Sequence, residues 1–169
     1  MKKLLLLLVV LTPALCRAQV TAAEESYRKA ESKFHIYMET EITATRPRML
    51  LKQLKKKTEM LLELEKAYQK VIKYKEPVFM VSSAYKLGLA YENMALVLKK
   101  IPPPASLTPE QQQIYKQELD AKALPFEEKA LVSFRAAVKK AKELGAFTDH
   151  ARLAEERLRE LDKQEKPAK

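Results

Sequence analysis

The 169-residue chain has no tryptophan, two glycines, two histidines and one cysteine. One cysteine excludes an intramolecular disulfide and a cysteine-based zinc site. Two glycines are too few for a glycine-rich loop that would cradle phosphates. The histidines, His35 and His150, lie too far apart in the sequence to predict a metal site. Folding must therefore depend on the packing of apolar side chains.

Groupings of side chains that suggest catalysis are equally scarce. The acidic pairs Glu127-Glu128 and Glu155-Glu156 are adjacent in the sequence, so on a helix the two members of each pair diverge. No nucleophile elbow, paired-carboxylate cleft or histidine cluster is present. The sequence therefore predicts no catalytic residue, no cofactor and no metal ligand, and we expect that the protein is not an enzyme.

The N-terminal apolar run is shorter than the roughly 20 residues that cross a bilayer. A basic start, residues 1–3, precedes apolar residues 4–11, and Cys16-Arg17-Ala18 places small residues where a signal peptidase reads. We predict a signal peptide over residues 1–18, cleaved after Ala18, and export to the periplasm or the outer membrane. A lipid anchor on Cys16 is the alternative, which the large preceding residue, Leu15, disfavours.

Alanine, leucine, glutamate and lysine are abundant, and they favour helices. Apolar residues recur at helical spacing between proline-marked breaks, which predicts an all-α domain over residues 19–162 and a polar tail over residues 163–169. We expect five or six helices and no strand. The predicted helices cover residues 21–42, 47–75, 78–100, 108–144 with a kink or break at Pro125, and 149–161.

Several residues mark the predicted helix ends. Thr45 is expected to cap the second helix, with Pro47 in its first turn. Thr108 and Gln111 are spaced as a capping box, and Gly145 suits the C-terminal cap of the same helix.

Positive charge is concentrated in one segment. The formal net charge is +10. The segment from Arg46 to Lys75 contains ten Lys or Arg residues and only three Glu. Within that segment Lys52, Lys55 and Lys56 point outward and predict a basic patch, whereas Lys57 falls in the apolar stripe, from which its stem would extend to water. The alternative is a solvated helix face without a ligand.

Two short motifs predict close packing of helices. Leu87-Gly88 is followed by Tyr91, and further on Ala130, Phe134 and Ala137 share the spacing Ala-x3-Phe-x2-Ala. Both are typical of a tetratricopeptide (TPR) unit, in which the Ala follows the Gly by 12 residues. Here that separation is 42 residues, which indicates an insertion of about 30 residues that contains a proline-rich loop. The segment Leu64-x3-Tyr68-x2-Val71 is an earlier half-motif.

The order of sequence blocks resembles the exported TPR proteins of adventurous gliding motility and related cell-envelope machinery. The resemblance covers about residues 61–161 and implies antiparallel helix hairpins in a right-handed superhelix, with degenerate repeats and an inserted proline-rich loop. It also implies an adaptor that binds other proteins. The matching blocks are Glu65-Lys66-Ala67-Tyr68, Tyr85-Lys86-Leu87-Gly88-Leu89-Ala90-Tyr91-Glu92, Pro102-Pro103-Pro104, Leu107-Thr108-Pro109-Glu110, Tyr115, Pro125-Phe126-Glu127-Glu128-Lys129-Ala130 and Ala141-Lys142-Glu143-Leu144-Gly145.

Two partner-binding surfaces follow from these patterns. Tyr85, Tyr91 and Asn93 are candidates for a groove that takes a helix or an extended segment of a protein partner in the cell envelope. The alternatives are that the tyrosines fill gaps between helices and that Asn93 is a capping or exposed residue. Lys52, Lys55 and Lys56 are candidates for binding an acidic protein, an anionic lipid surface or an envelope polymer. Export disfavours a nucleic acid partner, and a membrane-surface or polymer-binding protein is the alternative function.

Overall fold

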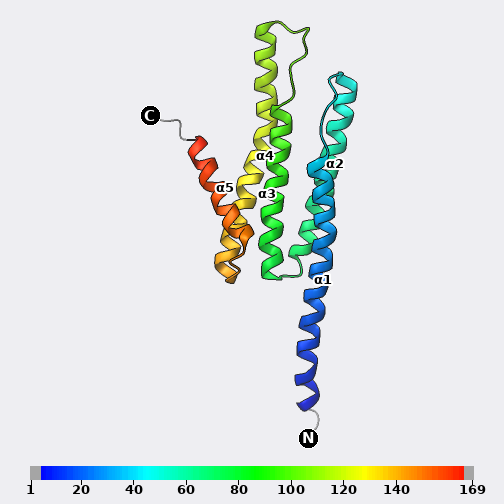
Figure 1. Ribbon diagram of the computed structural model, residues 1–169, viewed down its shortest axis with the longest axis vertical. Helices are drawn as coiled ribbons and strands as arrows, with labels where there is room; N and C mark the ends of the chain where they lie inside the picture. Colours follow the sequence, from blue (N-terminus) through cyan, green and yellow to red (C-terminus); the bar gives the residue numbers. More distant parts are fainter. Residues whose placement is uncertain (1–4, 166–169) are drawn as a thin grey trace.

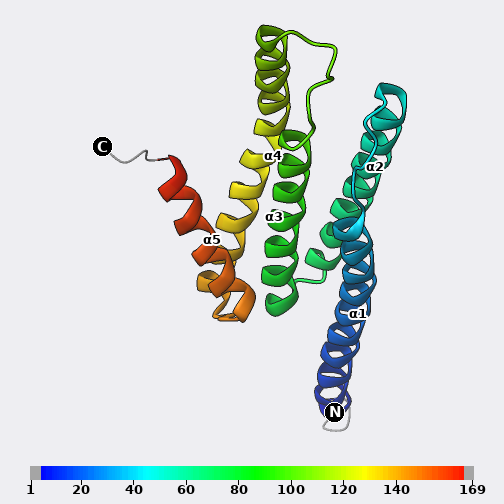
Figure 2. The same ribbon diagram turned by 45° about the horizontal axis from the view of Figure 1, so that its top comes forward.

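The structure, a computed structural model, describes the backbone of residues 5–165 and the side chains of residues 22–163. Five helices and no strand make up the described part of the chain, which confirms the all-α prediction. The helices run alternately up and down (Figures 1 and 2). They are α1 (Leu5–Glu39), α2 (Pro47–Ile72), α3 (Pro77–Lys99), α4 (Pro109–Leu144) and α5 (Asp149–Glu165).

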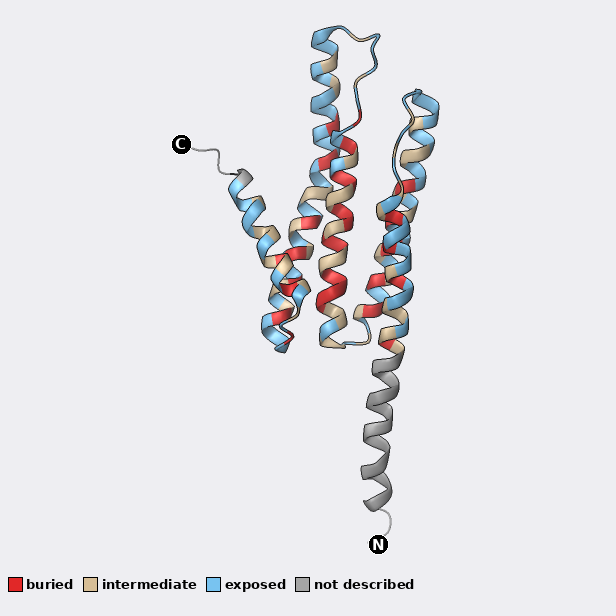
Figure 3. Cartoon of the chain, viewed as in Figure 1, coloured by how far each residue is buried: buried red, intermediate tan, exposed pale blue. Residues whose placement is uncertain are grey.

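Helix α3 is the centre of the fold. It packs against each of the other four helices, and its contact with α4 is the most extensive in the structure. Eleven of its residues are buried, from Val81 to Leu98, and they occupy most sides of the helix (Figure 3). A helix that is apolar on nearly every side is stable only when neighbours surround it. The α1–α2 hairpin covers one side of α3, and α4 with α5 covers the other.

The two halves of the predicted packing motif meet in space. Gly88 of α3 faces Phe134 of α4, and a Cβ built on Gly88 would lie 2.5 Å from Cε1 of Phe134. Ala130, Phe134 and Ala137 are all buried on the α4 side of this contact. The 42-residue separation in sequence is taken up by the end of α3, the connection over residues 100–108 and the start of α4.

Both predicted ends of α4 are confirmed. The Thr108 side chain accepts a hydrogen bond from the Gln111 backbone, and the Gln111 side chain accepts one from the Thr108 backbone. Gly145 adopts the left-handed conformation, φ +65°, at the end of α4. The prediction for Thr45 is wrong, because Arg46 is the N-terminal cap of α2 and makes no side-chain capping bond.

The sequence predicts a kink or a break at Pro125. Helix α4 continues through this residue, so the helix is not broken there. The helix changes direction along its length in both ribbon views (Figures 1 and 2). Its first half extends beyond α3 and buries only Leu119 and Ala123, whereas the second half carries the motif that packs on α3. A proline removes one backbone hydrogen bond and crowds the preceding turn, which accounts for a bend there.

Lys57 corrects one prediction from the sequence. Its side chain is 1% exposed and does not extend to water. The ammonium donates hydrogen bonds to the backbone carbonyls of Tyr37 and Thr40, at 3.0 and 2.6 Å, and lies 4.4 Å from the centre of the Tyr37 ring. The last carbonyls of a helix have no partner within the helix, and a positive charge is favourable there. Lys57 of α2 therefore caps the C-terminus of α1.

Part of the N-terminal prediction falls outside what the structure describes. Helix α1 begins at Leu5, within the predicted signal peptide, but residues 1–4 and the side chains up to Thr21, including Cys16, lie outside the described residues. The last four residues of the predicted polar tail also lie outside them. Over residues 22–163, no helical segment has the length and apolar character needed to cross a membrane.

Candidate functional site

A cleft between the two hairpins is the main candidate site, with a volume of about 410 Å³. One wall is formed by the end of α1 and the α1–α2 connection, residues 40–46. The other wall is the end of α3 and the chain that follows it. We refer to this site as the hairpin cleft, and its lining includes Met38, Ile42, Leu50, Lys57, Asn93, Val97 and Ile101.

The wall formed by the α1–α2 connection is held in place by side chains of α2. The Gln53 side-chain oxygen accepts hydrogen bonds from the backbone N–H groups of Thr43 and Ala44, at 3.1 and 2.9 Å. Lys57 binds the carbonyl of Thr40 from the same side. Because this short connection is bonded to one helix at its start and at its middle, the cleft is preformed, which lowers the entropy lost on binding.

The hairpin cleft opens into a second hollow. This hollow has a volume of about 440 Å³ and is lined by Pro102–Pro104, Leu50 and Tyr115. The proline and tyrosine rings offer flat apolar surfaces, and the proline backbone has no N–H group to donate a hydrogen bond. The second hollow is mainly apolar, whereas the hairpin cleft also presents polar side chains, so the two together could contact both the backbone and the apolar side chains of a peptide segment.

Asn93 lies in the hairpin cleft, as one of the predicted groove residues. Its side-chain oxygen is buried, and no described group donates a hydrogen bond to it. A buried acceptor without a donor is unfavourable by about 1–3 kcal/mol. A bound segment with an N–H group at this point would remove that penalty. Val97, one helical turn further on, lines the cleft beside Asn93 and was not among the predicted site residues. The i+4 spacing of Val97 from Asn93 is the sequence signal that could have identified this residue.

The two predicted tyrosines lie elsewhere. Tyr91 is 5% exposed and fills the core, with the Lys129 ammonium 5.2 Å from its ring centre. Tyr85 is half-buried on the α5 side of α3, where its ring stacks on His150 with a centroid separation of 5.2 Å. Both placements fit the gap-filling interpretation of the tyrosines. The structure thus brings only Asn93 of the three into the cleft.

The predicted basic residues lie outside the hairpin cleft. Lys52, Lys55 and Lys56 are exposed on α2, on the side away from the cleft-lining residues Leu50 and Lys57. A single binding site cannot include both sets. The basic residues therefore form a separate surface.

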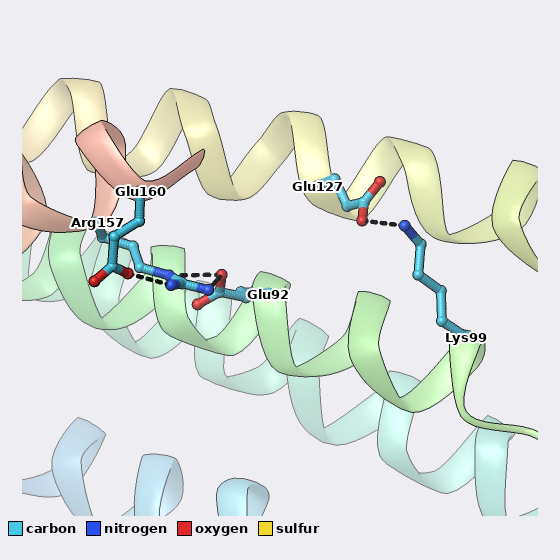
Figure 4. Close-up of polar contacts among 5 residues, drawn as sticks. All are labelled: Glu92, Lys99, Glu127, Arg157 and Glu160. Atoms are coloured by element: carbon cyan, nitrogen blue, oxygen red, sulfur yellow. Dashed lines mark hydrogen bonds and ion pairs between the residues drawn. The ribbon is translucent and has the colours of Figure 1, made fainter. Parts of the chain in front are cut away.

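A second groove, of about 420 Å³, lies between α3, α4 and α5. Leu96, Leu124, Leu131 and Leu161 contribute to its lining. Two charged pairs join these helices: Arg157 of α5 bonds Glu92 of α3, and Lys99 of α3 lies 2.6 Å from Glu127 of α4 (Figure 4). Arg157 also pairs with Glu160 of its own helix. The Arg157–Glu92 pair joins residues 65 apart, so no local sequence pattern predicts it.

His150 connects the start of α5 to α3. Its Nδ1 lies 2.8 Å from the Ser82 hydroxyl oxygen. Burial lowers the pKa of His150 below its usual value, and the nearby Lys86 ammonium lowers it further, while the Glu31 and Asp149 carboxylates act in the opposite direction. The folded protein therefore favours the neutral imidazole.

This lowered pKa predicts that acidification weakens the fold. An unfolded chain takes up a proton at His150 near pH 6.5, whereas the folded chain resists it, so the free energy of unfolding falls as the pH drops below about 6.5. We expect His150→Gln to remove that part of the loss between pH 7 and pH 5, measured by urea unfolding followed by circular dichroism. His35→Gln, at an exposed histidine, is the control for the loss of a histidine as such. An equal slope in all three proteins would contradict the assignment.

Among the described residues, no three His, Cys, Asp or Glu side chains are grouped as a metal site would need. Comparison with models of known protein families gives no match, and no curated protein or solved structure that was compared is significantly similar to the chain. The role of the candidate site is therefore inferred from its geometry and not from a relative.

Proposed function

We propose that this protein is an exported, TPR-like adaptor of the periplasm or cell envelope that binds a segment of a protein partner in the hairpin cleft. The observation that carries the proposal is the buried Asn93 oxygen, which has no donor in the described structure and lies in a cleft of mixed polar and apolar lining between the α1–α2 hairpin and the end of α3. A peptide N–H is the donor that an extended segment provides most readily. The protein would act by surface complementarity and not by catalysis.

The repeat interpretation has its own support. Leu64, Tyr68 and Val71 of α2 share the spacing of Ala130, Phe134 and Ala137 of α4, and all six are buried. The two hairpins thus use equivalent positions of their second helices for the core. A TPR-like superhelix with two degenerate repeats would have this property. The resemblance to envelope and gliding-motility proteins favours a role in an envelope complex.

Partner binding can be separated from folding at Asn93. Replacing Asn93 with Leu removes an unpaired buried acceptor, so we expect the free energy of unfolding to stay the same or to rise by about 1 kcal/mol. The same change removes the proposed hydrogen bond to the partner and should weaken partner capture from envelope extracts at least about tenfold. The measurements are urea unfolding and an affinity pull-down at low and at moderate salt.

Ser83→Ala is the matched control. Ser83 also carries a buried oxygen without a described partner, but it is fully buried in α3 and does not line the hairpin cleft. It should resemble Asn93→Leu in stability and the wild type in partner capture. Capture of the same discrete protein by the wild type and by Asn93→Leu with equal strength would reject the cleft as the binding site.

A further inference from the structure

Helix α2 has two contrasting sides. Its inner side buries Leu61, Leu64, Tyr68 and Val71 against the bundle. Its outer side, extended by one residue past the helix, carries seven exposed basic residues and only two exposed acidic residues, Glu59 and Glu63. The basic residues are Arg48, Lys52, Lys55, Lys56, Lys66, Lys70 and Lys73. We call this surface the α2 basic face; its net charge is +5, spread over a helix about 39 Å long at 1.5 Å per residue.

Little of this charge is neutralised within the protein. Lys55 lies 4.0 Å from Glu59, but Glu63 is engaged by Lys33 of α1 at 2.8 Å. Among the described side chains, none forms an ion pair with Arg48, Lys52, Lys56 or Lys73, which lie along the face from one end of the helix to the other. A row of like charges held close together is unfavourable unless a partner supplies negative charge.

Apolar side chains are exposed among these charges. Leu51 is 69% exposed and Leu62 is 50% exposed. At 3.6 residues per turn, Leu51, Lys55 and Leu62 lie within about 40° of one another around the helix. Exposed leucines beside lysines on one helix face are typical of helices that lie in a membrane interface, where apolar groups enter the acyl boundary and cations meet the head groups.

We propose that the α2 basic face docks the protein on an anionic lipid membrane. The lysines would contact the acidic head groups, and Leu51 and Leu62 would enter the interface. A symmetric contact with the same face of a second copy does not fit, since it would oppose +5 with +5. A soluble acidic polymer would use the charges and leave the two leucines without a role.

Docking through this face leaves the hairpin cleft accessible. The α2 residues that line the cleft, Leu50 and Lys57, lie on the inner side of the helix. The protein would thus bind a membrane and a protein segment at the same time. This inference is independent of the proposed function, because it concerns different residues and a different ligand.

The test is co-sedimentation of the full chain with vesicles of 30% phosphatidylglycerol in phosphatidylcholine, compared with vesicles of phosphatidylcholine alone. The readout is the ratio of the two partition coefficients, so that any binding by other parts of the chain cancels. The variant K52E/K55E/K56E should lower this ratio by a factor on the order of 100, at roughly fivefold per lysine near an anionic surface. Rising salt should lower the wild-type ratio and leave the variant nearly unchanged.

Two further variants make the test specific. K116E/K122E/K142E changes the net charge equally at exposed lysines of α4 and should keep the wild-type ratio within about twofold, since charges away from the contact act weakly. L51S/L62S should lower vesicle binding about tenfold while leaving binding to soluble polyglutamate unchanged. Equal ratios for the two triple variants would overturn the proposal. Polyglutamate binding as strong as vesicle binding, with no effect of L51S/L62S on either, would also overturn it in favour of an acidic polymer.

Discussion

Replacing Gly88 with Ala is expected to destabilise the protein by about 2 kcal/mol, although alanine is the better helix former. A Cβ at this position would lie 2.5, 2.6 and 2.9 Å from three carbons of the Phe134 ring. Carbon atoms do not approach that closely, and the ring is fully buried, so it has no free space to move into. The measurement is urea unfolding followed by far-ultraviolet circular dichroism.

Two effects oppose each other in this variant. Alanine in a helix interior is favoured over glycine by about 1 kcal/mol. Overpacking a closed core is unfavourable by about 1–3 kcal/mol, and the upper end of that range applies because the α3–α4 contact is the most extensive in the structure and Phe134 is fully buried. The packing penalty therefore exceeds the helix preference.

The sign of the effect should reverse when Phe134 is made smaller. In a Phe134→Ala background all three ring carbons that obstruct the Cβ are absent, so Gly88→Ala should be neutral or stabilising by up to about 1 kcal/mol. Gly145→Ala is the control for glycine in general. It has no neighbour within 4 Å, but its φ of +65° strains an alanine by about 1 kcal/mol in either background. A stabilising Gly88→Ala in the wild-type chain would contradict the close contact.

Replacing Lys57 with Ala is expected to destabilise the protein by about 3 kcal/mol. The substitution removes a fully buried side chain of four methylene groups and leaves a cavity. It also removes the ammonium that serves the carbonyls of Tyr37 and Thr40 at the end of α1. Burial lowers the pKa of Lys57, and the Glu41 carboxylate acts in the opposite direction without restoring it, so the charge is held in the interior at some penalty.

Lys57→Met separates the packing from the capping. Methionine keeps most of the volume and removes the donor, so this variant should lose about 1–2 kcal/mol. Lys56→Met is the matched control, because it removes the same charge from the neighbouring, exposed position and should change stability by less than about 0.5 kcal/mol. If the two methionine variants were equally stable, Lys57 would have no capping role.

The sequence alone determined the elements whose signals are local. Thr108, Gln111 and Gly145 mark the ends of α4 because their side-chain chemistry and backbone freedom act within a few residues. The spacing of apolar residues predicted the helices and the all-α class, since one side of each helix must be buried. Gly88, Ala130 and Phe134 even indicated which helices approach closely, although 42 residues separate the first two.

Only the tertiary structure decided which side chains meet. Lys57 stands in an apolar stripe, and nothing near it in the sequence reveals that its partners are carbonyls 17 and 20 residues away. Tyr85, Tyr91 and Asn93 share one helix, but neighbouring helices separate them into an α5 contact, a core residue and a cleft residue. The physical reason is that a helix distributes nearby residues around its axis by periodicity, whereas burial and contact depend on where the other helices are placed.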